Sequence, residues 1–196
     1  MSVFNILSIE EFQNWIKNQK FKRDINLIQN HHTLEPSYSD FNNHNHQKLL
    51  QNIEEFHIKE RGFRQIAQNL TTFPDGKIAI CRSLDMTPAG IKGANMGAIC
   101  IEHLGNFDLN KDKMTDLQKT CIITLNAILC HRFKLQPNTN TIVYHHWFDL
   151  DTGKRTNGSG NVKTCPGTDF FGGNSVKSAE TNFVPLVSQT LKNIKD

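Results

Sequence analysis

The chain has 196 residues, of which 37% are hydrophobic and 21% are charged, and its formal net charge is +3. This balance is ordinary for a soluble globular protein, and the length suits one domain with a sizeable buried core. The mildly basic charge is no signature of nucleic-acid binding, so we expect no nucleic-acid partner.

The five cysteines are an odd number and do not suggest a disulfide framework. Three of them lie in apolar runs, which predicts buried thiols in a protein made in a reducing compartment: Cys100, Cys121 and Cys130. The N-terminus lacks the pattern of a signal peptide, and no apolar run reaches membrane-spanning length. We therefore expect a chain that is cytoplasmic as synthesised, not inserted in a membrane, and monomeric.

The first third of the chain predicts a helix, a strand and a second helix. A capping box, Ser8-x-x-Glu11, precedes apolar residues at helical spacing, which indicates a helix over about 8–18. Residues 25–30 read as a strand that leads into two histidines. A polar loop over 35–46 separates it from a helix whose apolar positions run from 49 to 56.

The middle of the chain predicts a hairpin and then a buried strand. Residues 65–73 and 77–81 are strand-like and flank a Pro-Asp-Gly turn, as in a β-hairpin. A loop over 85–96, rich in Gly, Pro and Asn, is followed by an apolar strand over 97–103. Its compact apolar character favours a central position in a sheet.

The last third predicts helix, strand and helix. Thr115-x-x-Gln118 caps a long helix that runs to about residue 133, with one apolar face formed by Leu117, Cys121, Leu125 and Leu129. A strand over 141–146 follows, and a final helix is expected over 178–195. The order of elements predicts a single α/β domain, with a central mixed sheet flanked by helices.

Candidate metal ligands lie far apart in the sequence, but all are residue types that bind the same kind of metal ion. The strand over 141–146 ends in two histidines, and a glycine-rich loop leads from it to a tight turn that carries Cys165. Histidine and cysteine are ligands that hold zinc, and the best third candidate lies at the end of the first strand, in the pair His31-His32. Two histidines and one cysteine would leave a fourth position open, which is the catalytic arrangement.

These motifs resemble a known family. The chain has His31-His32-Thr33 at a strand end, a Pro-Asp-Gly hairpin, an apolar strand ending in Ile-Glu, His145, and Lys163-x-Cys165-Pro-Gly. In this order they resemble the type-2 zinc-dependent N-acetylmuramoyl-L-alanine amidases, which include phage endolysins, bacterial autolysins and peptidoglycan recognition proteins. The resemblance covers about residues 20–175 and implies one amidase domain over 1–196, with a C-terminal helix over about 178–195.

The resemblance implies that zinc (Zn2+) is bound by His31, His145 and Cys165. It favours the first histidine of each adjacent pair, and strand geometry agrees that only one of two neighbours can reach a metal, because successive side chains point to opposite faces. The second histidines, His32 and His146, are then expected to contact substrate.

Catalytic and substrate-binding roles are implied in the same way. Lys163 matches a catalytic lysine that would stabilise an oxyanion, and Glu102 matches a glutamate that accepts a proton from water. Gln68 stands where many members have a tyrosine, and Gln cannot transfer a proton, so catalysis should depend on Glu102. Gln68, Arg82 and Asn95 are expected to contact substrate.

An insertion over 151–161 lengthens the segment between His145 and Cys165 beyond that of compact members, and we expect this loop to contact substrate.

The implied activity is hydrolysis of the amide bond between N-acetylmuramic acid and L-alanine, with peptidoglycan or muropeptides as partner. Two alternatives remain open. One is a module that binds peptidoglycan without cutting it, although non-catalytic members typically lose the metal-binding cysteine. The other is a cytosolic amidase that recycles anhydro-muropeptides by the same chemistry.

Overall fold

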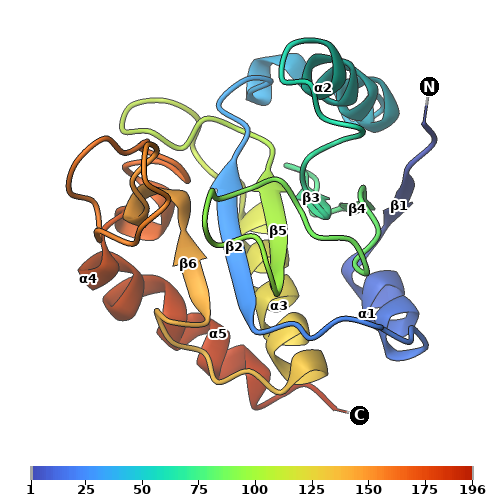
Figure 1. The fold of residues 1–196 in the computed structure, drawn as a ribbon. Helices are drawn as coiled ribbons and strands as arrows, with labels where there is room; N and C mark the ends of the chain where they lie inside the picture. The colour runs from blue at the N-terminus through green and yellow to red at the C-terminus, as the bar shows by residue number, and fades with distance from the viewer. Residues whose placement is uncertain (1, 196) are drawn as a thin grey trace.

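Six strands form one mixed sheet in the order β1-β4-β3-β5-β2-β6 in the computed structural model, which describes residues 2–195 (Figure 1). The strands are β1 (Asn5–Leu7), β2 (Leu27–His32), β3 (Leu70–Thr72), β4 (Ile78–Ile80), β5 (Ala98–His103) and β6 (Ile142–Tyr144). β3, β5, β2 and β6 run parallel, whereas β4 is antiparallel to β3 and β1. The mixed sheet and the hairpin were both predicted, but β1 was not, because three residues carry too little pattern.

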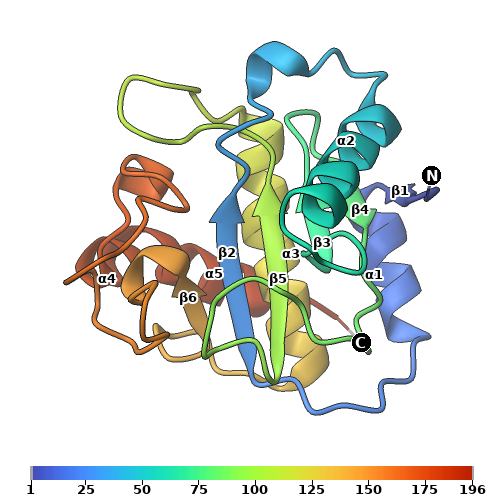
Figure 2. The same cartoon turned by 45° about the horizontal axis from the view of Figure 1, so that its top comes forward.

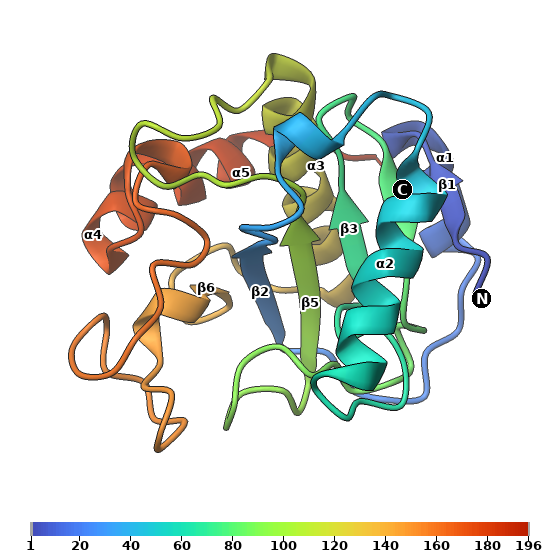
Figure 3. The same ribbon diagram turned by 90° about the horizontal axis from the view of Figure 1, so that it is seen from above.

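Helices cover both faces of this sheet. They are α1 (Ile9–Lys17), α2 (His46–Lys59), α3 (Asp116–Phe133), α4 (Val176–Ser178) and α5 (Val184–Leu191). α1 and α5 pack beside α3 on one face, and α2 lies over the opposite face (Figures 2 and 3). Within the described residues, no helix has the length and apolar character needed to cross a bilayer.

Two helix predictions need correction. The helix expected over 178–195 is broken into α4, a π-helical turn over Ala179–Phe183, and α5, which ends at Leu191. Pro185, in the first turn of α5, has no N–H to continue a regular hydrogen-bond ladder. In α3, Leu117 is 63% exposed rather than buried, because the inward position of that turn is taken by Gln118, whose amide donates to backbone carbonyls.

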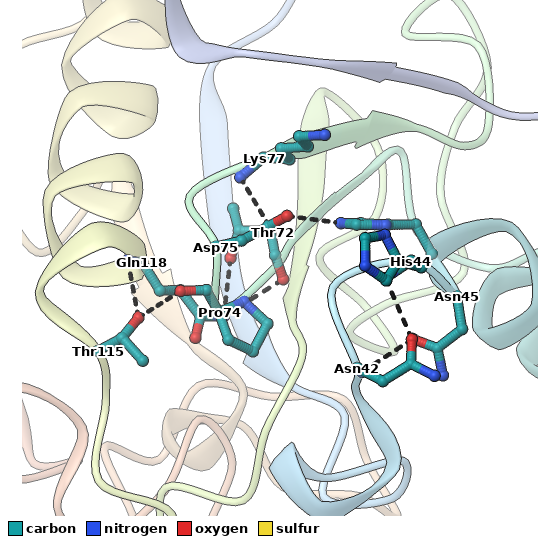
Figure 4. Close-up of polar contacts among 10 residues, drawn as sticks. Asn42, His44, Asn45, Thr72, Pro74, Asp75, Lys77, Thr115 and Gln118 are labelled. Atoms are coloured by element: carbon teal, nitrogen blue, oxygen red, sulfur yellow. Dashed lines mark hydrogen bonds and ion pairs between the residues drawn. The ribbon is translucent and has the colours of Figure 1, made fainter.

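The turn of the β3–β4 hairpin anchors both α2 and α3 (Figure 4). The Asp75 carboxylate lies 2.9 Å from Nε2 of His46, the first residue of α2. The Thr115 hydroxyl, which caps α3, donates to the carbonyl of Pro74. These contacts fix α2 over one face of the sheet, where it forms a wall of the cleft described below.

A buried polar network joins the sheet to α3. His103 Nδ1 lies 2.9 Å from the Thr72 hydroxyl and its Nε2 lies 3.0 Å from Asn30 Oδ1. The amides of Asn30 and Asn126 bond to each other in both directions. Asn30 Oδ1 therefore accepts a hydrogen bond from the Nε2–H of His103, and the Thr72 hydroxyl donates one to Nδ1. Both ring nitrogens are then hydrogen-bonded, and the ring is neutral.

This network should make stability depend on pH. Burial lowers the pKa of His103 to about 3 from its ordinary 6.5, with His32 as a lesser cause. Between these values the unfolded chain binds a proton that the folded chain excludes, so stability falls as the pH falls. The contribution of His103 to the free energy of unfolding is fully present above pH 6.5. It declines by about 1.4 kcal/mol per pH unit down to pH 3.

Urea unfolding of the metal-free protein at several pH values measures this slope. The control is His103→Gln, whose amide can replace both ring hydrogen bonds but cannot titrate. We expect the variant to lose stability less steeply below pH 6.5 than wild type. Equal slopes in the two proteins would contradict the assignment.

Candidate metal centre and its cleft

A cleft of about 1010 Å³ opens where the parallel strands β5 and β2 end. Register places Thr71, Glu102 and His31 side by side on β3, β5 and β2, and His145 follows directly after β6. Because parallel strands end at one edge of a sheet, residues far apart in the chain meet there. The sequence-predicted residues that line the cleft are His31, His32, Gln68, Glu102, His145, Lys163 and Cys165.

Three ligand atoms converge on the floor of this cleft. Nδ1 of His31 lies 3.2 Å from Nδ1 of His145 and 3.6 Å from Sγ of Cys165, and the three atoms all lie within 4.8 Å of one another. Zinc bonds of ~2.1 Å to nitrogen and ~2.3 Å to sulfur at tetrahedral angles would separate such atoms by about 3.3–3.6 Å. The donor set and its spacing fit a zinc ion.

Burial prepares the two imidazoles as ligands. It holds the pKa of His31 well below its usual value, with His145 as the next cause, and it lowers the pKa of His145 to about 4. Both rings are thus neutral near pH 7, the form that binds metals. Burial also raises the pKa of Cys165, so its thiolate needs a cation beside it.

The loop that carries Cys165 is held from two sides. The backbone N–H of His146 donates to the carbonyl of Cys165 over 2.7 Å, and Nδ1 of His146 lies 2.6 Å from the carbonyl of Lys163. On the other side, Asp108 accepts from the Thr164 hydroxyl and from the backbone N–H of Thr168. These bonds place the sulfur opposite the histidines.

A carboxylate and a cation accompany the three ligands. Glu102 is half-buried, and its carboxylate lies within 4.8 Å of a ring nitrogen of His31 and of the Cys100 sulfur. Burial raises the pKa of Glu102 to about 8, and the positive charge of Lys163 opposes that rise. The exposed Lys163 lines the same cleft. The arrangement therefore offers a proton acceptor and a positive charge next to a metal site.

Three predicted substrate contacts do not line the cleft. The guanidinium of Arg82 donates to the carbonyls of Ile66 and Thr87, so it supports the chain beneath the cleft. Asn95 accepts from two backbone N–H groups of its own loop. His146 organises the Cys165 loop as described above, and it also does not line the cleft.

The 151–161 loop was expected to contact substrate, and no residue of it lines the cleft. It packs instead against the loop before β5, where Lys92 Nζ donates to the carbonyl of Asp151. A Cβ on Gly93 would meet the Gly153 carbonyl oxygen at 2.4 Å, so the two backbones touch.

The second histidine of each pair should be dispensable for metal binding. His32 follows His31 on a strand, so strand alternation separates the two side chains. His145 and His146 lie in a 3-10 turn, where successive side chains also diverge, so alternation was the wrong reason for that pair. We expect His32→Ala and His146→Ala to keep their zinc by elemental analysis.

The matched variants His31→Ala and His145→Ala should lose most of the metal. If His32→Ala lost its zinc while His31→Ala kept it, His32 would be the ligand of that pair. The same comparison between His146→Ala and His145→Ala decides the second pair.

Some cleft residues were not found from the sequence. α2 and the chain after it contribute Asn52, Phe56 and Arg61 to the wall. Their helical pattern indicated only a packed helix, and nothing in it pointed to a cleft. Gln29 does not line the cleft but contacts the His31 ring, and it was also not singled out; a glutamine inside an apolar strand was the available signal.

Comparison with known proteins gives one family match. Residues 21–168 match the family model described as N-acetylmuramoyl-L-alanine amidase. A search of curated proteins found no match. Among solved structures, the N-acetylmuramoyl-L-alanine amidase LysC from Clostridium intestinale URNW is 27% identical, with a TM-score of 0.48, and the match covers 60% of this chain and 70% of that one.

Two structures of a Drosophila protein resemble the fold more closely. Wild-type PGRP-LB is 17% identical, with a TM-score of 0.59, and the match covers 76% of this chain and 78% of that one. A mutant of PGRP-LB in complex with tracheal cytotoxin is 16% identical, with a TM-score of 0.60 and coverage of 82% and 83%. At such identities the likeness concerns the fold alone.

Proposed function

Because the chain belongs to the N-acetylmuramoyl-L-alanine amidase family, we propose that it hydrolyses the amide bond between N-acetylmuramic acid and L-alanine, using zinc held by His31, His145 and Cys165. The observation that carries this proposal is the convergence of three zinc-type ligand atoms within 4.8 Å on the floor of an open cleft. A module that only bound the polymer would need the cleft but not the three ligands.

Each neighbouring side chain has a role in this reaction. Zinc bound there would supply Lewis acidity, polarising the scissile carbonyl and favouring ionisation of water. Glu102 accepts the proton of the attacking water and returns it to the amine of the leaving alanine. Burial raises the pKa of this carboxyl and the positive charge of Lys163 opposes the rise, which moves the pKa towards neutral pH, where one group can both accept and return a proton.

Lys163 stabilises the negative charge that develops on the carbonyl oxygen, because this cation lines the cleft together with the three ligands. Lys163→Ala is therefore expected to keep its zinc and lose about 10²-fold or more in turnover. Steady-state kinetics on a soluble muropeptide, with zinc content measured on the same sample, check this. Lys154→Ala, on the loop that packs away from the cleft, is the control and should remain near wild type.

The proposed reaction is tested by its products. Purified protein is incubated with sacculi and, separately, with soluble muropeptides, and the released ends are identified by mass spectrometry. Free N-terminal L-alanine on the peptides, together with intact lactyl groups on the sugars, is the expected result. Activity on both substrates indicates a wall-lytic amidase, and activity on muropeptides alone indicates a recycling enzyme. Binding to sacculi without any release would refute the proposal.

A further inference from the structure

A fully buried glutamine lies directly behind the metal ligands. Gln29 precedes His31 by two residues on β2, so both side chains point to the same face of the sheet. Its Oε1 lies 3.4 Å from Nε2 of His31, the ring nitrogen on the side away from Cys165. This contact uses Nε2, the one ring nitrogen of His31 that the three-ligand cluster leaves free.

The orientation of the Gln29 amide follows from its other contact. Its Nε2 lies 2.8 Å from the carbonyl oxygen of Ala94. A carbonyl can only accept, so the NH2 group must face Ala94 and Oε1 must face His31. Oε1 can also only accept, so the hydrogen bond to His31 requires a proton on Nε2 of the ring.

The loop that carries Ala94 is built closely around this pair. A Cβ on Gly90 would approach Gln29 Oε1 to 2.3 Å and His31 Nε2 to 3.2 Å, so a side chain at position 90 would push the Gln29 amide out of this place. Asn95 holds the same loop by accepting from the N–H groups of Gly90 and Ile91. Gln29 is therefore packed against the backbone of this one loop, at Gly90 and at Ala94.

We propose that Gln29 is a positioning residue that keeps the His31 proton on Nε2 and so presents a bare Nδ1 to zinc. A neutral imidazole with its proton on Nε2 has its lone pair on Nδ1, the atom that faces His145 and Cys165. Partners of this kind fix the tautomer and ring orientation of a metal-binding histidine, and their loss typically costs 10–100-fold in metal affinity.

The proposal rests on the zinc site proposed above, but its first test needs no metal. Long-range proton–nitrogen correlation spectra of the 15N-labelled, metal-free protein distinguish the two neutral tautomers of His31. We expect the Nε2–H form in wild type. In Gln29→Met, which keeps the length but loses the acceptor, we expect a larger share of the Nδ1–H form.

Zinc affinity gives the second readout, by competition with a chromogenic chelator. We expect Gln29→Met to bind zinc about 10–100-fold more weakly than wild type. Gln29→Glu should recover much of the loss, because one oxygen still accepts from His31 and its protonated second oxygen can donate to Ala94. Gln118→Met removes another fully buried amide, which lies on α3 and does not contact the proposed ligands, and it should leave the affinity unchanged.

A wild-type His31 in the Nδ1–H form, or an unchanged zinc affinity in Gln29→Met, would overturn the proposal. If Gln29→Met does not fold, the wild-type spectrum and the Gln29→Glu variant still decide it. A wild-type protein that takes up no zinc would instead refute the proposed function, and the tautomer result would stand separately.

Discussion

Cys165→Ser is expected to weaken zinc binding strongly and to abolish amide hydrolysis. The serine hydroxyl does not ionise near neutral pH, so the site would lose the negative ligand that lies 3.6 Å from His31 Nδ1. The double variant His31→Ala/Cys165→Ser should hold no zinc at all. Elemental analysis after dialysis, together with release of peptides from sacculi, measures both effects.

Cys81→Ser is the matched control, because this thiol is half-buried and bonds to Thr71 rather than to the metal ligands. It should keep about one zinc per chain. Full zinc occupancy in the double variant would show that the metal is bound by other residues.

Glu102→Gln should retain zinc and substrate binding while its turnover falls by about 10²- to 10⁴-fold, the usual worth of a general base. The amide keeps the size and polarity of the side chain but cannot accept the proton. Gln68 cannot replace it: its NH2 group already donates to Thr71, and an amide does not transfer protons near pH 7. Kinetics on a soluble muropeptide at several pH values, with zinc measured in parallel, give the comparison.

Glu35→Gln is a suitable control, since this carboxylate lines the outer cleft on the loop after β2. A Glu102→Gln enzyme within a few-fold of wild type at every pH would place the base elsewhere.

The sequence predicted the three residues of the candidate metal site because their chemistry is local, and the structure brings them together. Each of two short motifs suggests a metal ligand by itself: the strand that leads into His31, and the turn that carries Cys165 before proline and glycine. Their meeting depends on parallel strands ending at one edge, which the order of elements also indicates. The central strands, the hairpin and the capped α1 and α3 were predicted for the same reason, since each has a strong local pattern.

The features that could not be predicted from the sequence depend on tertiary contacts. Arg82 was expected to contact substrate, and no local pattern showed that its guanidinium donates to two backbone carbonyls. The 151–161 loop has no pattern that says which way it folds, and its contact with Lys92 turns it from the cleft. The wall formed by α2 is set by His46 and Asp75, which lie 29 residues apart.

Two of the three proposed ligands are fixed by the sheet itself, and this has a consequence for how metal and fold are coupled. His31 lies in the central strand β2, where it pairs with Glu102 of β5, and His145 directly follows β6, which pairs with β2. Only the turn with Cys165 depends on loop contacts. Unlike a small zinc-dependent module, such a protein would keep its tertiary structure when stripped by a chelator. Its thermal midpoint would then rise gradually with free zinc, as mass action on an already folded receptor requires.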